Sequence, residues 1–364
     1  MGWSTTSDLD RFAGAAGGYL RARAAENTLL LSATAQAARS QTRGAGLLFG
    51  WWTPPDGGDP RGAFVHDPAL PLLISGRVPE MAAALAVTLA KPGRQVCGVD
   101  APTEAADAFA AAWSQRAGTV VRAHRMCRVY RLTAQETAAP GAWPPPEPSG
   151  QPGRLRVAVP EDHAMLADWL RAAAIEAAER LVSPSDLAAD LISYGGAIFW
   201  EAPHKPSRFR DAAHHLAIPH RREMAQFGEP VPQPVTLVTL TRPVAATVRI
   251  DLVYTLPDRR GNGYASALTQ AVSRVLLQGS EPGNAAPGVL GHGCVREVVM
   301  ITDKNRPDRW GGRIGYQLVG ERAVLRFGPA TGPMARQGQT RANQTGPMPR
   351  LPTGPLPRLP RPWR

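Results

Sequence analysis

The sequence predicts a mixed α/β protein, of the α+β type, arranged in two domains. A strand pattern at 248–255 is followed by a glycine turn and then by a helical pattern at 264–277. Short strand and helix patterns also alternate on both sides of a proline-rich segment, 140–153. Because alternating strands and helices pack as a sheet covered by helices, we expect a helix-flanked sheet in each domain.

The strand and the helix of 248–277 are both read from their periodicity. Val248, Ile250, Leu252 and Tyr254 alternate with other residues, as in a half-buried strand, and Pro257 ends the pattern. From Tyr264 onward, apolar residues recur at helical spacing. These residues are Leu268, Ala271, Val272, Val275 and Leu276.

The turn between this strand and helix contains two glycines. Gly261 and Gly263 allow positive φ and the close approach of a ligand. The free amides that begin the helix lie at its positive end, so the turn is predicted to bind a phosphate or pyrophosphate. The lysine of a Walker loop is missing, and Ser266 stands where a dinucleotide fingerprint has its third glycine. Both of these common nucleotide motifs are therefore disfavoured.

Residues 1–139 are predicted to form an N-terminal α/β domain. The start, 8–49, is alanine-rich and mostly helical by pattern. The elements expected after it are strands at 63–66, 70–75 and 95–99, helices at 79–90 and 103–116, and one or two strands within 120–132. The stiff segment 140–153 is the predicted linker to the second domain.

Residues 154–328 are predicted to form the second domain, and either domain is long enough for a core of its own. The elements expected before the glycine turn are a strand at 154–159, helices from Pro160 and Ser183, and strands at 197–201, 235–240 and 244–255. Those expected after its helix are a strand at 295–302 and one or two within 316–327. The long connections 202–234 and 279–293 are either lids or disordered insertions.

The segment Arg260-Gly261-Asn262-Gly263-Tyr264-Ala265 resembles the Arg/Gln-x-x-Gly-x-Gly/Ala signature of the GCN5-related N-acetyltransferases, the GNAT family. The order of elements across 154–328 is also similar to that family, and Tyr194-Gly195-Gly196 and Arg313-Ile314-Gly315-Tyr316 look like phrases of its bacterial members. The resemblance implies a mostly antiparallel sheet and acetyl-CoA as the acyl donor. The order of elements in 1–139 is similar as well, so that region is either a diverged copy or a structural and substrate-shaping domain.

The resemblance also implies which residues contact the cofactor. The amides of the turn would bind the pyrophosphate of coenzyme A, and the strand before it would carry the thioester, with an amide near Val253 or Tyr254 as oxyanion donor. The cofactor-binding residues that it implies are Leu252, Val253, Tyr254, Arg260, Gly261, Asn262, Gly263, Tyr264, Ala265, Ser266 and Asn305.

Transfer of an acetyl group to an amine needs a base, because an ammonium ion has no lone pair. Asp251 is the first candidate, since relatives carry a base on this strand, and Glu201 is the second. The alternatives for each are a surface carboxylate and a salt bridge with a nearby arginine. Relatives often place a tyrosine acid after the next strand, but 303–313 contains none. The alternatives to an enzyme are therefore a non-catalytic acetyl-CoA-binding or regulatory module, or an interaction protein acting through its tail.

Composition narrows the other function classes. The chain has 364 residues and a net charge of +11. Six of its arginines lie in the proline-rich tail 329–364, which is predicted to be disordered, so the remaining chain carries only +5. This mildly basic remainder makes nucleic acid a disfavoured partner. Three cysteines without CxxC spacing, and His214, His215 and His220 without a zinc pattern, predict neither a disulfide framework nor a metal site. With no signal or membrane segment recognised, we expect a cytoplasmic protein whose acceptor is a small-molecule or peptide amine. The acceptor's identity and the oligomeric state are left open.

Overall fold

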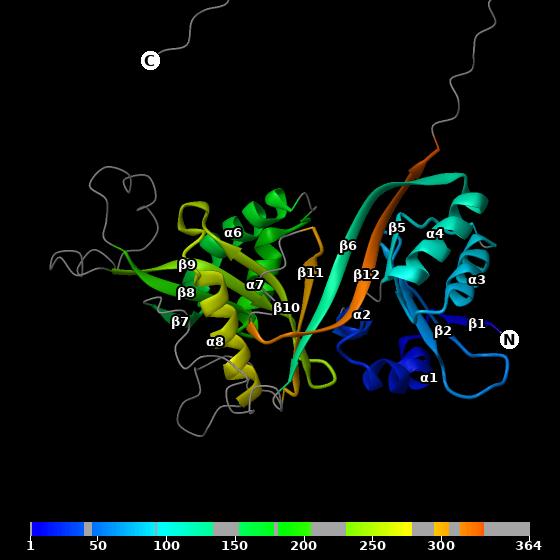
Figure 1. Ribbon diagram of the computed structural model, residues 1–364, viewed down its shortest axis with the longest axis horizontal. Coiled ribbons are helices and arrows are strands. Elements are labelled where there is room, and N and C mark those ends of the chain that lie inside the picture. The colour runs from blue at the N-terminus through cyan, green and yellow to red at the C-terminus, as the bar shows by residue number, and fades with distance from the viewer. Residues whose placement is uncertain are drawn as a thin grey trace, which may run out of the picture. The chain divides into compact units, whose positions relative to one another are not determined.

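The strands in the described part of the chain join one twelve-stranded sheet in the order β1-β2-β3-β4-β5-β12-β6-β11-β10-β9-β8-β7 (Figure 1). The structure is a computed structural model. It describes residues 2–39, 46–91, 93–133, 153–177, 181–204, 231–278, 295–305 and 314–330. The sheet is mostly antiparallel, with parallel pairing of β4 with β5 and of β10 with β11.

The first half of the chain supplies six strands and four helices to the described structure. They are β1 (Trp3–Thr6), α1 (Leu9–Ala22), α2 (Thr28–Arg39), β2 (Leu48–Trp52), β3 (Gly62–His66), β4 (Leu72–Ser75), α3 (Pro79–Ala90), β5 (Gly98–Pro102), α4 (Thr103–Ala117) and β6 (Thr119–Thr133). Asp8 caps α1 by accepting hydrogen bonds from the amides of Asp10 and Arg11.

The second half repeats this order. Its elements are β7 (Arg154–Val157), a 3-10 turn (Pro160–Asp162), α6 (His163–Glu176), α7 (Pro184–Ser193), β8 (Ala197–His204), β9 (Val231–Leu240), β10 (Thr247–Thr255), a 3-10 turn (Pro257–Arg259), α8 (Tyr264–Gln278), β11 (Glu297–Asp303) and β12 (Gln317–Pro329). Residues 306–313, between β11 and β12, lie outside the described part.

The two halves exchange their last strands. β6, from the first half, pairs with β11 of the second, from Thr133 opposite Glu297 to Cys127 opposite Asp303. β12, from the second half, pairs with β5 of the first. β6 and β12 run side by side along the middle of the sheet (Figure 1). Each half-sheet is therefore completed by a strand from the other half.

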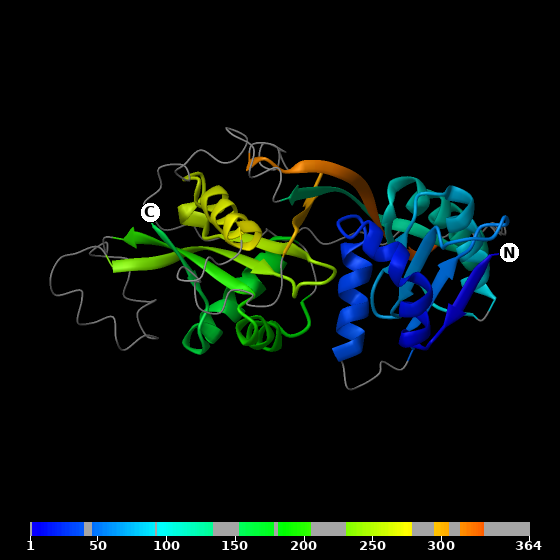
Figure 2. The same cartoon turned by 90° about the horizontal axis from the view of Figure 1, so that it is seen from below.

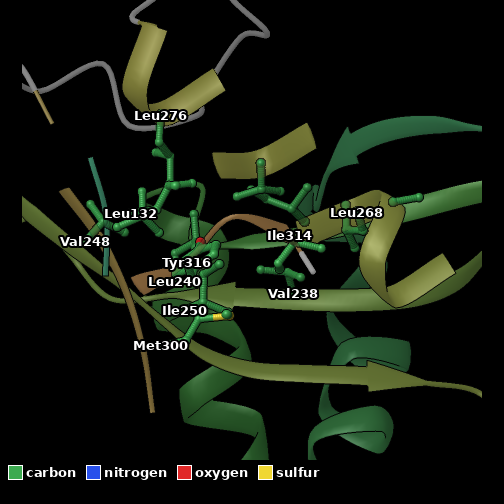
Figure 3. Packing of buried hydrophobic residues seen from close by; sticks show 14 of the residues in the cluster. Leu132, Val238, Leu240, Val248, Ile250, Leu268, Leu276, Met300, Ile314 and Tyr316 are labelled. Carbon is green, nitrogen blue, oxygen red and sulfur yellow. The ribbon is translucent and has the colours of Figure 1, made fainter. Parts of the chain in front are cut away.

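The exchange carries side chains into the other half's core. α8 packs on one face of the second half-sheet, and α6 and α7 pack on the opposite face (Figure 2). The α8 core includes Leu132 of β6, which is fully buried among Val248, Met300 and Leu276 (Figure 3). In return, Ala323 and Leu325 of β12 lie in the core that α3 and α4 cover.

The fold class predicted from the sequence is confirmed, including the mostly antiparallel sheet. Strand β2 was not expected, because 8–49 was interpreted as mostly helical, and β1 lies before that segment, where no element was predicted. Strands β8 and β9 extend into the segment 202–234, of which 205–230 lies outside the described residues. The linker, the segment 279–293 and the tail from 331 also lie outside, so the domain boundaries remain predictions. Among the described residues, no helix combines the length and apolarity needed to cross a membrane.

Candidate functional site

A β-bulge at Asp251 opens the sheet. β10 pairs with β11 as far as Ile250 opposite Met300, and its register with β9 shifts between Ile250 and Leu252. Ile250 packs in the α8 core, whereas Leu252 packs on the opposite face, in the α6 and α7 core. Without the extra residue these two side chains would share a face. The bulge therefore exchanges the sheet faces on which alternate β10 side chains pack, at the point where β10 separates from β11.

The reversal also turns backbone amides toward the opening. The Leu256 amide donates to the carbonyl of Val235 in β9, at 3.1 Å. Because amide directions alternate along a strand, those of Val253 and Thr255 point away from β9, to the side from which β11 has separated. Of the two oxyanion donors considered from the sequence, the strand geometry favours Val253 over Tyr254.

The glycine turn leads directly into α8. Gly261 and Gly263 both have a φ of 80°, a conformation that favours glycine. The first helical hydrogen bond runs from the Ala267 amide to the Gly263 carbonyl, at 3.0 Å, so the amides of the three residues between them have no acceptor within the helix. The Asn262 side chain closes the turn by donating to the Arg259 carbonyl, at 3.0 Å.

A cavity of about 550 Å³ lies between the end of β10, the glycine turn and the C-terminal end of α6. Nine of the predicted cofactor-binding residues line it: Leu252, Val253, Tyr254, Arg260, Gly261, Gly263, Tyr264, Ala265 and Ser266. Residues that the sequence analysis missed also line it: Ala173, Glu176, Ala177, Thr255 and Arg259. Those from α6 lie in an alanine-rich stretch without a motif, and only the fold brings them here.

Two predicted cofactor residues do not line this cavity. Asn262 is occupied in closing the turn. Asn305 is exposed, and its backbone amide donates to Asp303 at 2.8 Å. His214, His215 and His220 lie outside the described residues, within which no cluster of three potential metal ligands occurs.

Arg260 is held at the cavity by an ion pair. Its Nη2 donates to both carboxylate oxygens of Glu176, at 2.8 and 2.7 Å, and its Nε donates to the Thr255 carbonyl at 3.0 Å. The guanidinium also lies over the Tyr254 ring, 5.7 Å from its centroid. Burial raises the pKa of Tyr254, and the Glu176 charge adds to the rise, so this phenol stays protonated at neutral pH.

Asp251 does not line this first cavity, although Leu252 beside it does. Its Oδ1 accepts from Arg249, with Nε at 2.9 Å and Nη2 at 2.8 Å, which leaves Oδ2 outside this ion pair. The Arg249 side chain is 9% exposed and the Asp251 side chain 57%. A buried arginine thus fixes the carboxylate while keeping it open to solvent.

Glu201, the second candidate base, is a buried member of an ion-pair network. Its Oε1 accepts from Arg156 Nε at 2.6 Å, and its Oε2 accepts from Arg154 at 3.0 Å. Arg156 also donates to both oxygens of Asp162, at 2.6 and 3.0 Å. Glu201 is 4% exposed and lines none of the cavities described here. These contacts favour the salt-bridge interpretation of Glu201 over a role as base.

The lining of the first cavity favours a bound anion. The amides that begin α8, the positive end of that helix, and Arg259 and Arg260 would all face an anion bound there. A Cβ on Gly261 would meet no atom within 4 Å, so the rim has open space where phosphate would approach. Glu176 is the only carboxylate in the cavity's described lining, and Arg260 neutralises it.

A scan against protein-family models finds no match, and a search of curated proteins finds no relative. Among solved structures, a Drosophila protein aligns at 13% identity with a TM-score of 0.53, over 90% of this chain and 98% of its own. A GCN5-related N-acetyltransferase from Sphaerobacter thermophilus aligns at 14% identity with a TM-score of 0.49, over 89% and 95%. A tandem GNAT protein from the clavulanic acid biosynthesis pathway aligns at 12% identity with a TM-score of 0.43, over 90% and 98%.

Proposed function

We propose that this chain, which has the fold of the GCN5-related N-acetyltransferases, binds acetyl-CoA in the first cavity and transfers its acetyl group to an amine. The observation that carries the proposal is that the residues after the β10 bulge and the residues of the glycine turn line one cavity. The bulge, the separated ends of β10 and β11 and the amides at the start of α8 meet at this cavity. Acetyl-CoA is a long thioester that carries a pyrophosphate, and it requires such a combination.

Acetyl-CoA would supply an activated acyl group as a thioester. Residues Gly261–Ser266 hold the pyrophosphate through their amides, and Arg259 and Arg260 add positive charge. The Val253 amide stabilises the oxygen on which negative charge develops. The acceptor nitrogen forms a bond to the carbonyl carbon as the carbon–sulfur bond breaks. Asp251, directly or through water, takes the proton that the amine loses.

The departing thiolate needs a proton as well. The segment 303–313 contains no tyrosine, so in this proposal water supplies the proton. The missing tyrosine also favours a second candidate function, a module that binds acetyl-CoA without turnover.

A thiol-release assay on the full chain separates the two functions. Acetyl-CoA would be supplied with a panel of amines, and free coenzyme A measured, beside a calorimetric titration of acetyl-CoA alone. The enzyme proposal predicts binding and amine-dependent thiol release that Asp251→Asn lowers. Binding without thiol release across the panel would favour the non-catalytic module, and absence of binding would refute both functions.

A further inference from the structure

Two smaller cavities, both lined by Asp251, are distinct from the proposed cofactor site. One, of about 400 Å³, lies between α2, α7 and the ends of β9 and β10. The other, of about 250 Å³, lies over β5, β12, β6, β11 and β10. Arg249 and Asp251 line both and so separate them. Since α2, β5 and β6 come from the first half, both halves build these cavities.

The charges that line these cavities are largely paired with one another. Arg249 binds Asp251 at 2.8 Å, and its Nη1 also contacts the Ser32 hydroxyl of α2 at 3.4 Å. Arg322 binds Asp100 at 2.8 Å. In the larger cavity, Arg242 binds Asp190 at 2.8 Å and its guanidinium lies 3.9 Å from the centroid of the Tyr194 ring. These pairs neutralise much of the charge that a bound molecule would meet, and Arg125 is a further cation in the lining of the smaller cavity.

Asp303 and Arg39, two lining residues of opposite sign, make no ion pair with any other described residue. Asp303, half-buried in the smaller cavity, accepts only the Asn305 amide, on Oδ1. Arg39, at the last turn of α2, lines the larger cavity and makes no ion pair within the described residues. The Arg249–Asp251 pair lies between them. A ligand that reaches both cavities therefore meets a free carboxylate at one end and a free guanidinium at the other.

We propose that the acceptor is a small amine that also carries a carboxylate, such as a free amino acid. This inference rests on the proposed function. The amine lies between Asp251 and Asp303, where β10 and β11 separate, and the carboxylate is bound by Arg39. Cavities of these sizes admit a small molecule or a chain end, and a peptide N-terminus lacks the adjacent carboxylate. The ion-paired residues shape the acceptor site. Asp303 and Arg39 select for an acceptor that carries both an amine and a carboxylate.

The test uses the full chain, acetyl-CoA and matched pairs of acceptors. Each pair consists of an amino acid and its carboxamide, for example leucine and leucinamide, which differ only in the carboxylate. We expect kcat/KM to be at least tenfold higher for the amino acid of an accepted pair. The amino group of the carboxamide is less basic than that of the amino acid, so it loses its proton more easily. A preference for the amino acid therefore cannot arise from amine basicity. Equal or better turnover of the amides, or turnover of uncharged amines alone, would overturn the inference while leaving the acetyltransferase proposal intact.

Charge-removing variants locate the two ends of the acceptor. Arg39→Gln should raise KM for the amino acid about tenfold and leave KM for its amide unchanged, whereas Asp303→Asn should raise KM for both. Arg116→Gln is the matched control, because Arg116 is an exposed arginine at the last turn of α4. An equal effect of Arg39→Gln and Arg116→Gln would overturn the assignment. A chain that releases no thiol with any amine would refute the acetyltransferase proposal and this inference together.

Discussion

Replacing Leu132 by alanine tests the strand exchange. Leu132 lies on β6, in the first half of the sequence, yet its side chain is fully buried in the α8 core of the second half (Figure 3). A buried leucine truncated to alanine costs about 2–5 kcal/mol. Whole domains are stable by only about 5–15 kcal/mol. We therefore expect Leu132→Ala to remove a large fraction of the stability of the second half.

The measurement is urea unfolding of the full chain followed by circular dichroism, together with hydrogen exchange at the β11 amides. Val121→Ala is the control, because Val121 lies on the same strand but is 41% exposed. It should change the free energy of unfolding by less than about 0.5 kcal/mol. Leu132→Ala should also speed exchange at Val298 to Met300, whose strand β6 protects.

Two results would refute this reasoning. One is a Leu132→Ala variant that is no less stable than Val121→Ala. The other is a fragment beginning at residue 153 whose β11 amides are as well protected as those of the full chain, because that fragment lacks β6 altogether.

Three further changes probe the sites. Glu176→Gln frees Arg260 from its carboxylate partner, so acetyl-CoA affinity should rise severalfold in a calorimetric titration; a weaker affinity would contradict the electrostatic account of the cavity. Asp251→Asn should lower kcat by about 10²–10⁴ without weakening acetyl-CoA binding, because it removes a base. Glu201→Gln should instead lower the free energy of unfolding. A loss of kcat in Glu201→Gln with a loss of stability in Asp251→Asn would exchange their roles. Burial raises the pKa of the Cys127 thiol to about 11, so the folded state favours the neutral form. Stability should be retained below the unfolded thiol's pKa and fall by about 2 kcal/mol as the pH rises from about 9 to 11. The stability of Cys127→Ala should fall less over that range.

Much of the fold could be predicted because local patterns were strong. The helix at 79–90 was predicted with its observed bounds, and the glycine turn and the start of α8 at Tyr264 were placed correctly. These elements combine a clear period with a proline or glycine at the boundary. Strand β1 was missed because four residues carry too little periodicity. The partner of β6 could not be predicted, because strand pairing between distant segments leaves no mark in either segment alone.

The candidate site divides in the same way. The cofactor loop was found because its glycines and its helix start are contiguous in sequence. The placement of Glu176 and of Arg39 depends on which helix ends face the opening, so their positions follow only from the fold. In the sequence, Asp251 and Glu201 are both carboxylates on strands, and only the resemblance to relatives with a base on that strand ranks Asp251 first. Their partners distinguish them, since Glu201 is enclosed by Arg154 and Arg156 while Asp251 faces solvent.

Calorimetric titration of acetyl-CoA into the full chain, compared across two glycine variants, tests the cofactor loop most directly. Gly261→Ala and Gly57→Ala impose the same backbone strain, about 1–2 kcal/mol, because their φ angles are 80° and 79° and neither new Cβ meets an atom within 4 Å. Of these two glycines, Gly261 lines the cavity and Gly57 does not. We predict that Gly57→Ala binds like the unaltered chain and that Gly261→Ala binds at least tenfold more weakly. Equal affinity in all three proteins, or no binding by the unaltered chain, would contradict the account.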